Sequence, residues 1–155
     1  MQRSLNTRIL MLALCLLLGA LPAAAVARPF SLHGAGNVAF TGGPPPTGGD
    51  LTASGTATHL GLWTAVGVLS FAPPDPDTPN LVPASGTQTF TAADGDKLHA
   101  ELTGELDTTT GIATGIFMFI GGTGRFESAS GSADFVVMQD PSGPFEVTAT
   151  GDIDF

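Results

Sequence analysis

The sequence contains few basic residues and no tyrosine. Five Lys and Arg residues stand against fourteen Asp and Glu residues in a chain of 155, and charged residues make up only 12% of it. This fraction is about half that of an average globular protein. An acidic protein repels nucleic acid and anionic membrane surfaces, so we expect neither as a partner. The acidic surface instead favours solubility.

Cysteine is also nearly absent, since Cys15 is the only one. It lies in an apolar stretch over residues 9–18 and follows a leucine, whereas lipid-modified cysteines resemble a pattern with a small residue before them. The residues after this stretch cannot form a disulfide with one another. The three histidines, His33, His59 and His99, lack the spacing of zinc ligands. We therefore predict neither a metal nor another cofactor.

Residues 1–27 have the three parts of a secretory signal peptide. Arg3 and Arg8 form a basic segment, the apolar stretch follows, and the segment ends in small residues. The apolar part is shorter than the roughly 20 residues of a membrane-spanning helix, so we predict no stable membrane insertion. Cleavage after Ala27 leaves one domain at residues 28–155 with three cations and fourteen carboxylates, a net charge of −11. We expect that domain to be secreted or periplasmic.

Side-chain alternation predicts β-strands along most of the domain. Residues 97–106 alternate apolar and polar positions, and residues 145–155 repeat the pattern, as expected for strands with one buried face. Residues 112–120 are apolar on both faces, which predicts a strand covered on both sides. Further strands are expected at residues 30–41, 51–59, 61–71, 86–93 and 131–139. No segment has an amphipathic period long enough to bury a helix.

The expected fold is all-β, a single antiparallel β-barrel of about eight strands. Glycine and proline, 21 and 12 residues, mark turns at nearly every boundary between the expected strands. Closure of the sheet is favoured because the chain lacks the lysines that usually block pairing at sheet edges. The side chains expected to be buried are Phe117, Phe119, Phe126, Phe135, Val137, Phe145, Val147 and Ile153.

A glycine-rich segment at residues 121–131 carries a family resemblance. It reads GGTGRFESASG and is similar to the motif GG-(T/S)-G-x-F-x-x-A-x-G of the allene oxide cyclase and dirigent barrel group. The resemblance covers residues 51–155 and implies a calycin-like, eight-stranded antiparallel barrel. The mature chain has neither the tyrosine nor the disulfide common in dirigent proteins. The motif residues that we single out are Gly121, Gly122, Gly124, Phe126, Ala129 and Gly131.

The residue types of this motif favour a structural role. Gly121 and Gly122 end an apolar strand, and Gly124 can supply a positive φ. Phe126 and Ala129 place one large and one small side chain where the chain re-enters the barrel. A phosphate-binding loop would need a Walker lysine and a following helix, and the segment has neither. The expected role is therefore a structural plug.

Three residues are candidates for acid–base chemistry. Asp134 shares a strand face with Val136 and Met138, so its carboxylate would need a partner, for which Arg125 is the natural candidate. We expect this pair to be structural, whereas a buried Asp134 with a raised pKa would be a general acid or base. His59 is expected to fix a bend by hydrogen bonding, with a place at the mouth of a pocket as the alternative.

Two kinds of function remain open. We favour an exported, non-enzymatic barrel that is structural or binds a small hydrophobic molecule, because no catalytic constellation is recognisable. The candidate ligand-binding residues are Trp63, Phe117, Met118 and Phe119. The resemblance implies the alternative, an allene oxide cyclase-like or dirigent-like isomerase or stereochemical guide that acts on a hydrophobic substrate. The sequence leaves the oligomeric state open.

Overall fold

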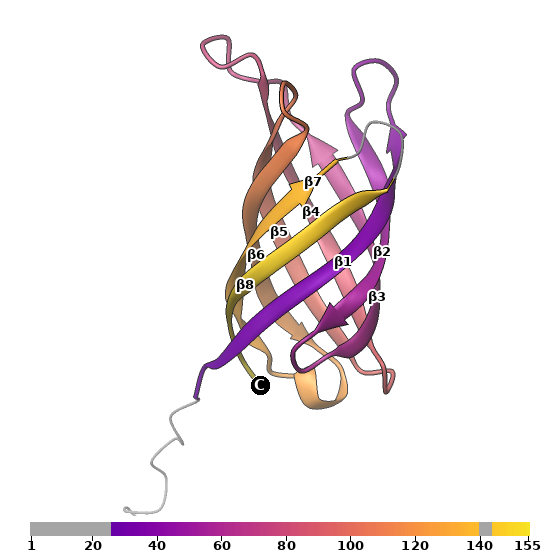
Figure 1. Cartoon of the computed structure of the whole chain (residues 1–155), viewed down its shortest axis with the longest axis vertical. Helices are drawn as coiled ribbons and strands as arrows, with labels where there is room; N and C mark the ends of the chain where they lie inside the picture. The colour runs from indigo at the N-terminus through magenta and orange to yellow at the C-terminus, as the bar shows by residue number, and fades with distance from the viewer. Residues whose placement is uncertain (1–25, 140–143) are drawn as a thin grey trace, which may run out of the picture.

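Eight antiparallel strands form a closed barrel, seen from the side in Figure 1. The structure is a computed structural model and describes residues 26–139 and 144–155. Each strand pairs with the next in the sequence, and β1 pairs with β8 to close the barrel. The prediction of an all-β antiparallel barrel is confirmed. The strands are β1 (Arg28–Thr41), β2 (Gly48–Ala57), β3 (Gly61–Phe71), β4 (Leu81–Ala92), β5 (Lys97–Asp107), β6 (Ile112–Gly122), β7 (Ser130–Met138) and β8 (Phe145–Asp154).

The first strand, β1, is the longest and pairs with two neighbours, β8 and β2. Its first part pairs with β8 from Arg28 opposite Ile153 to Gly36 opposite Phe145. Its later part continues beside β2 as far as Thr41. Because β1 contacts both neighbours in this staggered way, the strands tilt around the barrel axis and none is left as a free edge.

The interior of the barrel is apolar. Alternate residues of each strand point inward, and one continuous cluster of buried side chains runs through the barrel. Most of the side chains predicted to be buried are so: Phe117, Phe119, Phe126, Phe135, Phe145, Val147 and Ile153. Val137 is only partly buried and packs against the cluster. Within the described parts of the chain, no helix is both long enough and apolar enough to cross a membrane.

Strand β6 corrects the prediction that both of its faces are covered. Phe117 and Phe119 point inward, whereas Met118 and Ile120 are 47% and 54% exposed on the outer surface. The barrel wall is a single sheet, so only the inner face of a strand meets other side chains. An apolar outer position is left in contact with solvent.

Strand β4 begins earlier than the predicted residue 86. Residues 81–83 were expected to belong to a Pro-rich loop, yet Leu81 pairs with Asp107 and Pro83 with Glu105. Pro83 has no N–H to donate, but its carbonyl accepts a hydrogen bond from the Ala72 N–H at 3.0 Å. The proline therefore fits near the end of a strand.

Truncation of Phe119 should destabilise the protein far more than truncation of its neighbour Met118. Phe119 is 4% exposed and its ring packs edge-on against Phe30 at a centroid distance of 4.9 Å. Phe119→Ala should lower the free energy of unfolding by about 3–5 kcal/mol, whereas Met118→Ala should change it by about 0.5 kcal/mol or less. Urea denaturation of the two variants measures the difference. Equal effects would contradict the assignment of inner and outer faces.

Candidate functional site

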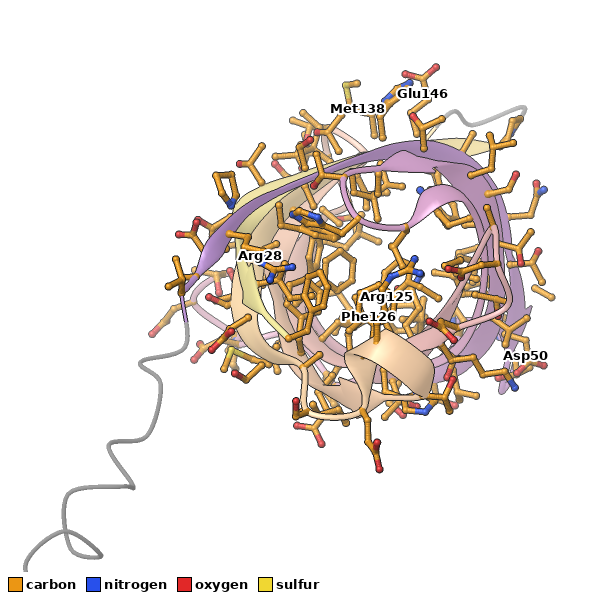
Figure 2. All side chains as sticks on the ribbon, turned by 90° about the horizontal axis from the view of Figure 1, so that it is seen from below. Arg28, Asp50, Arg125, Phe126, Met138 and Glu146 are labelled. Atoms are coloured by element: carbon orange, nitrogen blue, oxygen red, sulfur yellow. The ribbon has the colours of Figure 1, made fainter. Side chains whose placement is uncertain are left out.

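The two ends of the barrel differ. At the lower end in Figure 1, residues 123–129 cross the opening and include the short 3-10 helix η1 (Gly124–Phe126). Figure 2, seen from below, shows Arg125 and Phe126 over this opening, while Asp50 and Glu146 point away from the barrel. We call residues 123–129 the plug.

The plug seals the lower end with apolar contacts. Phe126 is fully buried, and its ring lies 5.0 Å from that of Phe155 near the end of the chain. The Arg28 guanidinium carbon lies 4.5 Å from the centre of the Phe155 ring, a cation–π contact. Leu60 and Ala129 are also buried here. The lower part of the interior is therefore filled by side chains.

Glycines allow the plug to approach the neighbouring turn closely. Gly124 has a φ of +58°, and a Cβ at this position would overlap the Asp96 carboxylate. Gly131, where the chain re-enters β7, has a φ of +125°. Residues other than glycine rarely adopt a backbone φ in this positive range. The motif glycines thus have a conformational role, and Phe126 and Ala129 are the large and small buried groups.

Arg125 holds the plug to two turns of the barrel. Its guanidinium forms ion pairs with Asp94 and, at 3.5 Å, with Asp96. Its Nη2 donates a hydrogen bond to the His59 carbonyl at 2.8 Å, and its backbone N–H donates to the Asp96 carboxylate at 3.1 Å. The guanidinium also lies over the Phe126 ring at 4.6 Å. These contacts link the β2–β3 turn, the β4–β5 turn and the plug.

The candidate catalytic residues do not converge. Asp134 is exposed on the outer face of β7, where it pairs with Ile116 and Thr150. The expected pair of Asp134 with Arg125 is wrong, because Arg125 forms its ion pairs with the β4–β5 turn. His59 is exposed in the β2–β3 turn with a φ of +67°, and its Nε2 lies 3.1 Å from the Pro29 carbonyl oxygen. The structure places His59 beside Arg125, at the sealed end, and Asp134 apart from both.

Four aromatic rings lie one after another across the middle of the barrel. Trp63 packs against Phe90 at a centroid distance of 5.5 Å, Phe90 against Phe117 at 5.8 Å, and Phe117 against Phe135 at 4.7 Å. All four line the cavity above them. We call these four residues the aromatic floor.

A chamber lies between the aromatic floor and the upper end of the barrel. Its cavity volume is about 90 Å³. At its mouth, Phe40 and Phe71 pack together at 6.0 Å, and Phe40 is 49% exposed. Among the described lining residues, Glu105 is the only ionisable one, and its side chain is exposed. Apart from the floor, the lining includes Leu32, Val38, Leu51, Ala53, Leu69, Ala84, Gln88, Leu102, Leu106, Ala113, Val137, Phe145 and Val147.

The predicted ligand-binding residues fall in three different places. Trp63 and Phe117 line the chamber, Phe119 is buried without lining it, and Met118 is on the outer surface. Sequence reasoning missed Gln88, whose side chain is 6% exposed and lines the chamber. The alternation of threonines at positions 87, 89 and 91 with Gln88, Phe90 and Ala92 is a signal that could have placed it on the inner face.

Two carboxyl groups at opposite ends have lowered pKa values. The Arg125 guanidinium and the Asp96 backbone N–H hydrogen-bond to Asp94 and hold its pKa below the usual 3.8. At the chamber end, the backbone N–H of Thr109 has the same effect on the pKa of Asp107. Among residues 26–139 and 144–155, no three His, Cys, Asp or Glu side chains are grouped as metal ligands would be.

Protonation of Asp94 should weaken the plug. Because the pKa of Asp94 is lowered in the folded protein, its stabilising effect is present above the unfolded value of 3.8 and is lost as the pH falls through the folded value. Asp94→Asn should therefore lower the urea midpoint at about pH 7 and have a smaller effect at about pH 2, because the wild-type carboxyl also becomes neutral as the pH falls through its folded pKa. Asp134→Asn, on the outer wall, is the matched control. A loss of the same size at both pH values would contradict this role.

The comparisons with known proteins do not assign the chain to a family. No protein-family model matches the chain, and no curated protein matches it. The function is therefore inferred from the geometry of the plug and the chamber.

Proposed function

We propose that the protein is an exported barrel that binds a small, mainly apolar molecule in the chamber. One observation carries this proposal: the chamber is lined almost entirely by apolar side chains and opens at one end, while the other end is sealed by the plug. Cavities that are concave, apolar and supplied with few polar groups are the usual sites for small ligands. An apolar ligand in this chamber would remove both its own surface and that of the walls from water.

The size of the chamber limits the ligand. One water needs roughly 10–15 Å³ of such a volume, so a cavity of about 90 Å³ has space for roughly six to nine water-sized groups. A ligand with about that number of non-hydrogen atoms would fit inside. A longer one would extend through the mouth between Phe40 and Phe71.

The chamber favours binding over catalysis. General acid–base chemistry needs a titratable side chain within hydrogen-bond reach of the bound molecule. Glu105 is the only ionisable group among the described lining residues, and it is exposed. Asp134 lies on the outer wall and Arg125 at the sealed end. The arrangement thus supports a carrier or sensor more than a cyclase-like or dirigent-like enzyme.

Toluene, which has seven non-hydrogen atoms, is a suitable first probe. Trp63 is the only tryptophan and the chain has no tyrosine, so fluorescence excited at the indole absorption edge reports on the aromatic floor. Toluene should change this fluorescence saturably. At about ten times its Kd, it should stabilise the fold by about 1.4 kcal/mol and raise the Tm by about 3–6 °C.

A blocked variant provides the control. Ala113 lines the chamber, whereas its neighbour Thr114 is exposed on the outer face. Ala113→Phe should fill the space and abolish the toluene response, and Thr114→Phe should leave it intact. If folded wild-type protein shows no saturable response up to the solubility limit of toluene, ligand binding is wrong and a structural role remains.

The export part of the proposal has its own test. Expression of the whole chain in a bacterium, followed by mass spectrometry of the periplasmic and secreted fractions, should give a protein that begins at Arg28. An Ala25→Arg, Ala27→Arg double variant should block cleavage, because the processing site requires small residues. Recovery of wild-type protein that still carries Met1, in the cytosol, would contradict export.

A further inference from the structure

The chamber contains one buried polar side chain, that of Gln88 on β4. It is the only buried polar or charged residue among those described, at 6% exposed, and it lines the chamber. Phe90 of the aromatic floor follows it by two residues on the same strand, so both side chains point inward and Gln88 lies nearer the upper end. Its carboxamide has two donor hydrogens and an acceptor oxygen. Burial of such a group is costly unless these atoms form hydrogen bonds.

The barrel itself supplies no partner for this amide. The inward positions next to Gln88 are occupied by Gly67 on β3, Ala100 on β5, and Gly86 and Phe90 on β4. None of these residues has a polar side chain, and the backbone groups of the three strands hydrogen-bond to one another in the sheet. Over residues 26–139 and 144–155, the side-chain amide of Gln88 forms no hydrogen bond.

The amide is nevertheless accessible from the chamber. Of the described side chains, only Trp63 has a polar atom that is both without a partner and sealed from any space. The amide of Gln88 lacks a partner but is not sealed in this way, so its polar atoms keep some accessible surface. Because the side chain points inward and lines the chamber, this surface faces the chamber. A molecule bound there can therefore reach the amide.

Water is a weakly held partner for this amide. A water inside a protein usually makes about three hydrogen bonds to polar groups. The walls around Gln88 are almost entirely apolar, and Gln139, the other amide that lines the chamber, is only half-buried and follows the upper end of β7. Water beside Gln88 thus lacks most of its usual partners. A ligand group that reproduces its hydrogen bonds to the amide would displace it at little cost.

The charges of the barrel argue against an anionic ligand. All three cations of the described chain are at the lower end: Arg28 and Lys97 begin β1 and β5, and Arg125 is in the plug. The upper end of β5 carries the carboxylates Glu105 and Asp107. An anion would have to pass these groups and lose its hydration without a countercharge. A neutral ligand has neither cost.

We propose that Gln88 selects a neutral ligand of the carboxamide class, whose one polar group both donates and accepts hydrogen bonds, and that the ligand enters with its apolar end first. This inference rests on the proposed function and names the ligand class of the same site. The apolar end contacts the aromatic floor, and the polar group stays beside Gln88, where each amide donates to the oxygen of the other. Amides and lactams satisfy both halves of the Gln88 amide. Ketones satisfy only its donor, and hydrocarbons satisfy neither half.

Four probes that each have nine non-hydrogen atoms test this selection on the purified protein: benzamide, acetophenone, isopropylbenzene and benzoate. The fluorescence of Trp63 gives their Kd values. Gln88→Met keeps the length of the side chain and removes the amide. It should weaken benzamide about tenfold and acetophenone about threefold, and change isopropylbenzene by about twofold or less. Benzoate should bind the wild-type protein more weakly than benzamide at neutral pH.

A control variant and a second measurement keep the outcome decisive. Thr87→Val, on the exposed outer face of the same strand, should leave all Kd values unchanged. If Gln88→Met does not fold, the side-chain NH₂ signals of Gln88 in the ¹H–¹⁵N spectrum of labelled wild-type protein decide. Benzamide should move them further downfield than isopropylbenzene, whose ring shifts them without a hydrogen bond.

The failures of the two proposals are distinguishable. Equal effects of Gln88→Met on benzamide and isopropylbenzene, equal shifts of the NH₂ signals, or tighter binding of benzoate than of benzamide would overturn the inference and leave the proposed function intact. Binding of none of the four probes would also overturn it. The proposed function fails with it only if toluene gives no response either.

Discussion

The pairing of β1 with β8 is the constraint on which the rest of the structure depends. It closes the sheet, so every strand acquires one inner and one outer face, and no backbone edge is left open. The closure also brings the ends of the domain together at the base, where Arg28 lies over the Phe155 ring. Phe155 in turn packs against Phe126 of the plug. The seal at the lower end is therefore a consequence of closure, because Arg28 begins β1 and Phe155 directly follows β8.

Side-chain size then decides which parts of the interior are filled. An eight-stranded barrel has a nearly fixed width, so large inward residues fill it and small ones leave space. The lower layers contain Phe30, Phe119 and Phe126, and these are almost completely buried. The chamber walls include Ala53, Ala84 and Ala113, which leave the axis of the barrel open. The same backbone geometry thus gives a packed base and a hollow upper end.

The strands could be predicted from the sequence more reliably than the contacts between them. Local patterns, alternation in most segments and a continuous apolar run at residues 112–120, identified all eight, because such patterns depend only on neighbouring residues. They could not tell which face of a strand with apolar residues on both sides is inside, so Asp134 and Met118 were assigned to environments that they do not have. The partners of Arg125 depend on which turns meet at the lower end of the barrel, and this follows from closure and register, which local patterns do not encode. The chamber could not be predicted from local patterns either, since its walls come from residues on all eight strands.

The upper part of the barrel interior is less completely filled than a purely structural role requires. A barrel that served only as a scaffold would gain stability if its upper layers were filled with larger apolar side chains, because burial of apolar surface is the main favourable term in folding. Instead, the chamber keeps exposed apolar walls and the amide of Gln88. The unfilled apolar space costs stability in the empty protein, and a bound molecule of complementary shape would remove that cost.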